Sequence, residues 1–168
     1  GGPGPGEPPR LLCVGAVIPR KGQDVLVRAL ARVTAFPWSC LCAGSLTRAP
    51  EFADSVLELA RAPGLEDRID FPGEVGAPEL DGLYHSASIF VLATHYEGYG
   101  MVLSEALARG LPVLSTRGGA VPDTVPPEAG MLVPPGDEAA LAVALEELLS
   151  DPGGGRRRAG LGGGSPRP

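Results

Sequence analysis

Two glutamates, Glu97 and Glu105, and the glycine-rich segment between them are the part of this sequence best suited to chemistry. An apolar run at residues 89–93 predicts a buried strand before Glu97. A helical pattern at residues 101–109 contains Glu105. Glu97 is therefore expected on the loop leaving a strand, and Glu105 inside the next helix. Because backbone N–H groups at a helix start favour anions, the segment suits a ligand with a hydroxyl-rich part and a phosphate part.

The spacing of the two carboxylates favours separate roles. A continuous helix would place them about 12 Å apart along its axis, so Glu97 and Glu105 are poor candidates for a pair that shares a proton. Two separated carboxylates suit the two ends of one long ligand, and a ribose diol is a natural partner for Glu105. The alternatives are a solvated loop acid at Glu97 and a charge complementing the helix dipole at Glu105.

The elements that must position these residues alternate along the chain. Strand patterns occur at residues 11–17, 38–43, 69–71, 89–93, 111–115 and 131–133. Helical patterns occur at 23–33, 51–62, 79–87, 101–109, 121–125 and 137–149. This alternation predicts an α/β fold with a doubly wound, six-stranded parallel sheet covered on both faces. The expected architecture is Rossmann-like, with strand order 3-2-1-4-5-6.

This strand order makes the first and fourth strands neighbours, and ligands bind where the chain turns in opposite directions from such a pair. The loop after the first strand carries Arg20 and Lys21. It lacks both the G-x-G-x-x-G pattern and the G-K-[ST] ending, which disfavours a nicotinamide enzyme and a P-loop NTPase. The Lys21 ammonium can meet a phosphate, or it is a solvated loop lysine. The topology places this cationic loop beside the acidic, glycine-rich loop.

Other residues on the same sheet edge have open roles. The pair Gly118-Gly119 follows the fifth strand as a second flexible loop, or as a simple turn. His95 is either catalytic or a structural hydrogen-bonding residue. Tyr96 and Tyr99 either line the crevice or pack the loop down.

Composition limits the class of protein. The chain has 168 residues, 43% of them hydrophobic, with a net charge of −6. The acidic balance argues against nucleic-acid binding, and no apolar stretch is long enough for a membrane span. Cys13, Cys40 and Cys42 lie in apolar runs, which predicts reduced, buried thiols in a cytoplasmic protein and no metal site. Residues 1–10 are predicted to be linker-like, residues 11–151 one domain, and residues 152–168 a disordered Gly/Arg/Pro tail.

Three motifs together resemble a known family. Residues 97–113 are similar to the glutamate-x7-glutamate signature of retaining glycosyltransferases of family four, which have the GT-B fold. Residues 14–22 resemble the phosphate loop after that family's first strand, and Gly118-Gly119 resembles its glycine pair before a short helix. The resemblance covers nearly all of residues 11–151. It implies a single lobe of a GT-B enzyme, the C-terminal domain that binds a nucleotide-activated sugar.

The resemblance also implies roles for individual residues. Lys21 would meet the diphosphate, with Arg20 beside it. Glu97 would hold hydroxyls of the donor sugar, and together with Lys21 it is an expected catalytic residue. Glu105 would hold the ribose. The base would lie near residues 73–75. The complete set of donor-binding residues is Arg20, Lys21, Val75, Glu97, Gly98, Tyr99, Gly100 and Glu105.

The implied chemistry is transfer of a hexosyl group from a nucleotide-diphosphate-sugar to an unidentified acceptor. Neither a metal nor a cofactor is expected, because cationic side chains and helix ends neutralise the diphosphate. The family often has arginine where this chain has Ala16, which removes one diphosphate contact, and the family's N-terminal acceptor domain is expected to be missing. The alternatives are a non-catalytic nucleotide or nucleotide-sugar binding module, inactive without an acceptor domain, and a degenerate domain that only binds a protein partner.

Overall fold

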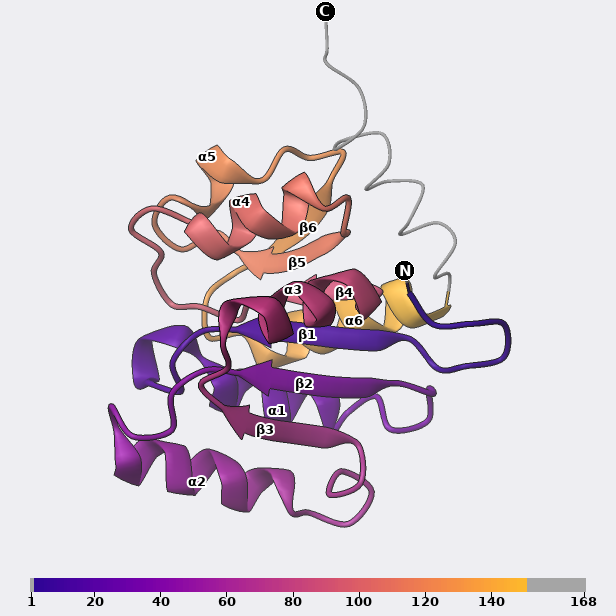
Figure 1. Ribbon diagram of the computed structural model, residues 1–168, viewed down its shortest axis with the longest axis vertical. Coiled ribbons are helices and arrows are strands. Elements are labelled where there is room, and N and C mark those ends of the chain that lie inside the picture. Colours follow the sequence, from indigo (N-terminus) through magenta and orange to yellow (C-terminus); the bar gives the residue numbers. More distant parts are fainter. Residues whose placement is uncertain (1, 151–168) are drawn as a thin grey trace, which may run out of the picture.

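The computed structural model of the protein describes residues 2–150, and its centre is one parallel sheet (Figure 1). The strands lie in the order β3-β2-β1-β4-β5-β6, and every neighbouring pair is parallel. The predicted fold class and strand order are thus confirmed. The strands are β1 (Arg10–Val14), β2 (Ser39–Ala43), β3 (Ile69–Gly73), β4 (Ile89–Val91), β5 (Val113–Thr116) and β6 (Gly130–Val133).

Helices cover both faces of this sheet. On one face α1 packs against α2 and α6, and on the other α3 packs on β1 while α4 and α5 pack on β5. Figure 1 shows α3 in front of β1, with α1 and α6 behind the sheet. The helices are η1 (Pro19–Lys21, a 3-10 turn), α1 (Gln23–Leu30), α2 (Pro50–Ala60), α3 (Ala77–Ser86), α4 (Met101–Ala108), α5 (Val121–Thr124) and α6 (Glu138–Ser150).

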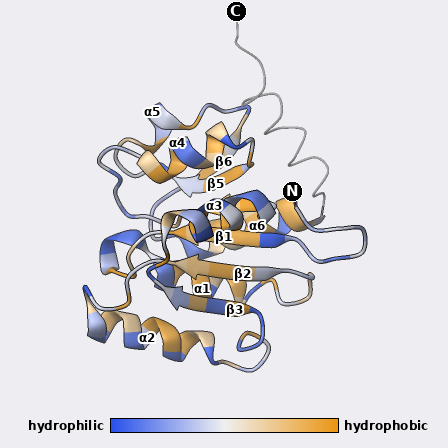
Figure 2. Ribbon diagram, in the orientation of Figure 1, coloured by the Kyte–Doolittle hydropathy of each residue, from blue (hydrophilic) through white to orange (hydrophobic). Residues whose placement is uncertain are grey.

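The two-sided cover explains the apolar strand sequences. Every residue of β4 and β5 is buried, as expected for strands in the middle of a parallel sheet. Figure 2 shows that hydrophobic residues make up most of β1 and of α6. Asp137 caps the last helix, because its Oδ1 accepts a hydrogen bond of 2.9 Å from the Ala140 amide.

Several strand boundaries differ from the predicted ones, and two of these differences have a clear physical cause. The first strand ends at Val14 instead of residue 17, because the chain beyond it follows the loop after β2. The Val17 amide donates to the Ser45 carbonyl at 2.9 Å, outside the sheet ladder. The third strand extends to Gly73, past Pro72, because β3 is an edge strand and can tolerate a residue without an N–H.

The described residues allow a check of the predicted lack of a membrane span, but not of the predicted C-terminal tail. Within residues 2–150, no helix has the length and apolarity needed to cross a bilayer. The tail predicted for residues 152–168 lies outside the described residues.

Candidate functional site

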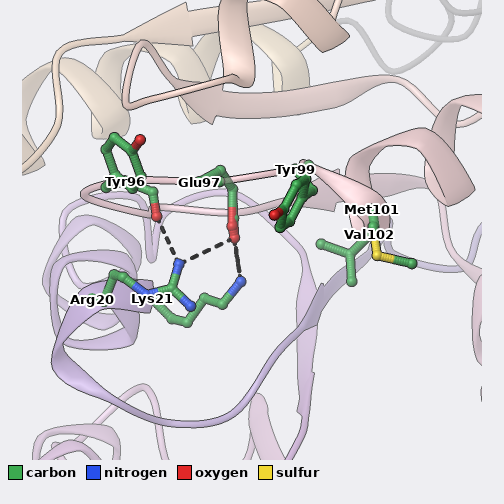
Figure 3. A pocket seen from close by; sticks show the side chains of 9 residues that line it. Arg20, Lys21, Tyr96, Glu97, Tyr99, Met101 and Val102 are labelled. Carbon is green, nitrogen blue, oxygen red and sulfur yellow. Dashed lines mark hydrogen bonds and ion pairs between the residues drawn. The ribbon is translucent and has the colours of Figure 1, made fainter.

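The loops after β1 and β4 meet at the carboxyl ends of these two neighbouring strands. Lys21 ends η1, and Glu97 lies on the loop between β4 and α4. The Lys21 ammonium donates hydrogen bonds to both carboxylate oxygens of Glu97, with 2.9 Å between Nζ and Oε2 (Figure 3). The structure therefore brings the cationic and acidic loops together, as the topology predicted. It adds a direct ion pair that the sequence did not predict.

The carboxylate of Glu97 is buried and faces two cations. Its side chain is 5% exposed, and that of Lys21 is 13% exposed. The Arg20 Nη1 atom lies 3.6 Å from Glu97 Oε1 and donates to the Tyr96 carbonyl at 2.8 Å (Figure 3). Two positive side chains against one negative one leave a local excess of positive charge. This arrangement attracts an anion although the chain as a whole is acidic.

A close backbone approach fastens the two loops to each other. Gly22, between η1 and α1, has φ 68°, and a Cβ there would lie 1.8 Å from the Ala93 carbonyl oxygen. Only glycine fits this position. The Arg20 carbonyl accepts hydrogen bonds from the His95 amide at 2.8 Å and from the Thr94 hydroxyl at 3.2 Å. The backbone that carries the cationic residues is thus held against the loop after β4.

The glycine pair after β5 supports Glu97 from the other side. The Ala120 amide donates to the Glu97 carbonyl at 2.7 Å. Gly119 has φ 61°, and a Cβ there would lie 2.3 Å from that same carbonyl oxygen. The sequence placed Gly118 and Gly119 on this edge but gave no sign of this contact. Their role in the structure is to set the backbone that carries Glu97.

The start of α4 opens onto the same cavity. Gly100 precedes the helix with φ 65°, and no side chain caps the free N–H groups of its first turn. These amides and the ion pair face a cavity of about 440 Å³, lined by Arg20, Lys21, Tyr96, Glu97, Gly98, Tyr99, Gly100, Met101 and Val102. Six of the eight predicted donor-binding residues therefore line one cavity.

The two remaining predicted residues line adjoining cavities. Glu105, on α4, lines a cavity of about 290 Å³ that shares Met101 and Val102 with the first. Val75 lines a third cavity of about 200 Å³, which shares Val14 and Leu80 with the second. The third also contains Ala16, Arg48 and Glu74. The three cavities form a continuous series along one edge of the sheet, with Glu97 and Glu105 in different members, as their spacing predicted.

The sequence analysis missed a cluster around Glu105. Arg109 donates from Nε to Glu105 Oε1 at 2.9 Å, and its Nη1 lies 2.6 Å from Asp81 Oδ1. The hydrogen bonds to Asp81 and Glu105 raise the pKa of the Arg109 guanidinium. Burial, followed by the Glu105 charge, raises the pKa of Tyr84 to about 12. The spacing of four residues between Glu105 and Arg109 could have indicated their pairing, whereas Asp81 lies on another helix.

The three cysteines are buried free thiols, as predicted. The hydrogen bond between Cys13 and Cys42, together with burial, raises the pKa of the Cys13 thiol. The hydrogen bond with Cys13 lowers the pKa of Cys42, but Cys40 and burial raise it further, and the net shift is upward. Among residues 2–150, no group of three or more His, Cys, Asp or Glu side chains is arranged to hold a metal ion.

Comparisons with known proteins agree on one family. A curated relative, the GDP-mannose-dependent alpha-(1-6)-phosphatidylinositol monomannoside mannosyltransferase of Mycolicibacterium smegmatis, is 31% identical over 95% of this chain and 42% of its own length. The chain thus spans about two fifths of that relative.

Solved structures give the same result. Sucrose-phosphate synthase from Thermosynechococcus elongatus matches with a TM-score of 0.79 and 33% identity, over 95% of this chain and 42% of that one. The C-terminal domain of a glycosyl transferase group 1 family protein from Francisella tularensis matches with a TM-score of 0.81 and 27% identity, over 91% of this chain and 82% of that domain. The six-stranded sheet is therefore the Rossmann-like lobe of GT-B glycosyltransferases. Because the model of the family described as glycosyl transferases group 1 matches residues 8–151, this chain belongs to that family.

Proposed function

We propose that the chain is the donor-binding lobe of a retaining glycosyltransferase, which binds a nucleotide-diphosphate-sugar and moves its hexosyl group to an acceptor. One observation carries the proposal. Three contiguous cavities run along the sheet edge, with two cations and a buried carboxylate at one end and a second carboxylate in the middle. A sugar, a diphosphate, a ribose and a base in one line need such a series of environments.

The cationic end suits the diphosphate. Lys21 and Arg20 supply two positive charges, and the uncapped amides at the start of α4 supply further donors. Lys21 is paired with Glu97 in the structure. A diphosphate competes for the Lys21 ammonium, which frees the Glu97 oxygens to accept hydrogen bonds from sugar hydroxyls. Glu105 takes the ribose diol and Val75 packs against the base.

The same charges support the transfer step. When the bond between the sugar and the diphosphate breaks, negative charge grows on the leaving phosphate, and Lys21 and Arg20 are placed to stabilise it. Because these side chains provide the neutralising charge, the proposal requires neither a metal ion nor another cofactor. In a retaining reaction the acceptor receives the sugar on the face from which the diphosphate leaves.

The named activities of relatives support the substrate class. The Mycolicibacterium smegmatis relative is a GDP-mannose-dependent mannosyltransferase, and a Salinispora tropica relative, 33% identical over 92% of this chain, is a D-inositol 3-phosphate glycosyltransferase. Three buried free thiols suit a reducing compartment, so we also propose that the protein works in the cytoplasm.

Calorimetric titration with UDP, GDP, UDP-glucose and GDP-mannose tests the proposal. We expect the wild-type chain to bind at least one of these, with affinity unchanged by EDTA. Lys21→Ala and Glu105→Ala should each weaken binding by about tenfold or more. Arg61→Ala, which breaks an exposed ion pair with Glu58 on α2, is the matched control and should bind normally. Unchanged affinity in both site variants would refute the phosphate and ribose assignments.

A second measurement separates catalysis from binding alone. Slow hydrolysis of the bound donor, or transfer to an added acceptor, would support a transferase. Tight binding without either reaction would favour the non-catalytic nucleotide-sugar binding module.

A further inference from the structure

Arg109 is the centre of a cluster that joins two helices beside the middle cavity. It follows the last residue of α4 at the C-terminal cap. Its guanidinium contacts Glu105 on the same helix, at 2.9 Å from both Nε and Nη2, and Asp81 on α3 at 2.6 Å. The guanidinium carbon also lies 4.9 Å from the ring centre of Tyr84. All four side chains line the cavity of about 290 Å³.

These contacts fix one oxygen of Glu105 and leave the other available. The Nε and Nη2 groups of Arg109 both point to Glu105 Oε1. Among the described residues, Oε2 accepts no hydrogen bond. The Glu105 side chain is 50% exposed, so without Arg109 it would sample several rotamers, and a ligand would have to order it on binding. Arg109 itself is held by Asp81 and by the face of Tyr84.

We propose that Arg109 is a positioning residue, which holds the Glu105 carboxylate so that its free oxygen accepts hydrogen bonds from the ribose hydroxyls of the donor. This inference rests on the proposed function. Arg109 itself does not touch the ligand in this role. It acts by removing the ordering cost from Glu105, because a group held in its productive rotamer before binding loses less entropy on capture.

The chemistry of arginine suits this role better than that of lysine. A planar guanidinium can direct separate N–H groups at two carboxylates while its face packs on an aromatic ring. A lysine ammonium at the same position keeps the charge but cannot make the same set of contacts. Arg109→Lys is therefore a partial variant, and Arg109→Ala is the complete one.

The decisive readout is discrimination between ribose and deoxyribose. UDP and GDP are each compared with their 2′-deoxy forms by calorimetric titration. In the wild-type chain, loss of the 2′-hydroxyl should weaken binding by about tenfold, as for a hydrogen bond to a charged group. In Arg109→Ala this ratio should shrink to less than about threefold, while affinity for the 2′-deoxy ligand stays near the wild-type value.

Two comparisons make the test specific. Glu105→Gln should lower the ratio in the same way, and adding Arg109→Ala to it should change the ratio no further. Arg61→Ala is the matched control, because Arg61 also occupies a helix C-terminal cap and pairs with a glutamate on its own helix, Glu58, at 3.0 Å. It should keep the full ratio. If Arg109→Ala fails to fold, Asp81→Asn removes the exposed anchor of Arg109 and should lower the ratio partly.

The outcomes distinguish the inference from the proposed function. A wild-type chain that binds none of the four nucleotides refutes the proposed function, and the inference falls with it. A wild-type chain that discriminates, together with Arg109 and Asp81 variants that discriminate equally well, overturns the inference alone. If the Arg109 variants weaken the binding of ribose and deoxyribose ligands by the same factor, Arg109 only holds α3 against α4, and the positioning role is wrong.

Discussion

Replacing Lys21 with methionine tests the buried ion pair at the base of the site. Methionine has a similar length but no charge, so the variant removes the ammonium with little change in packing. The Glu97 carboxylate, 5% exposed, then loses the donor that contacts both its oxygens. Arg20 remains as the only nearby cation recorded among the described residues, at 3.6 Å from Oε1, and its side chain is 48% exposed.

The expected cost follows from these contacts. Removing one partner of a buried ion pair costs about 3–5 kcal/mol. The remaining attraction to Arg20 offsets about 1–2 kcal/mol of this, after allowance for solvent screening at a half-exposed side chain. We therefore expect Lys21→Met to lower the free energy of unfolding by about 1–4 kcal/mol. Glu97→Gln removes the buried charge, so the double variant should be more stable than the sum of the single changes predicts, by about 1–3 kcal/mol.

Urea unfolding followed by the fluorescence of Trp38, the single tryptophan, measures these values. Trp38 is buried, and its indole donates to the Val33 carbonyl, so its emission should report global unfolding. Arg61→Met is the control, because the exposed pair with Glu58 should contribute less than about 0.5 kcal/mol. A loss below about 0.5 kcal/mol in Lys21→Met, or additive single changes, would show that the pair is not desolvated and would refute this reasoning.

Three other predictions concern backbone and pH. Gly110→Ala, at φ 75° with open space around it, should cost about 1–2 kcal/mol, whereas Gly119→Ala, at φ 61° and 2.3 Å from a carbonyl oxygen, should cost about 2–5 kcal/mol in the same urea assay. Because the pKa values of Cys13 and Cys42 are raised, iodoacetamide at pH 8 should leave both unmodified until urea unfolds the chain, and rapid labelling of the folded chain would contradict their burial. The pKa of Tyr84 is raised from 10.0 to about 12, so the stability that its neutral form contributes is complete below pH 10 and is lost as the pH rises to 12. Tyr84→Phe should therefore flatten the decline of the urea midpoint between about pH 10 and 12. An unchanged decline in this variant would contradict the raised pKa.

Much of the fold could be predicted because each strand carries its own apolar pattern. Runs such as residues 89–93 identify strands buried on both faces, and the alternation with helices then fixes a parallel sheet. The boundaries were less predictable, because they depend on neighbours in space. The first strand stops at Val14 through its contact with the loop after β2, and Pro72 is tolerated only because β3 lies at the sheet edge.

The site was likewise predictable only in part. The meeting of Lys21 and Glu97 follows from strand order alone, since β1 and β4 are neighbours. The Arg109 cluster does not, because Asp81 reaches it from a helix that no local pattern links to α4. The support of Glu97 by Gly119 could not be predicted either, because a glycine pair in the sequence does not indicate which carbonyl group it approaches.

The contact of Gly22 with the Ala93 carbonyl has a consequence for how a ligand enters. No hinge can operate between the loops after β1 and β4 without breaking this contact and the hydrogen bonds of the Arg20 carbonyl. The loops after β1 and β4 are thus expected to move as a single rigid unit. Ligand entry then depends on separating the side chains of Lys21 and Glu97, and not on slow segmental opening.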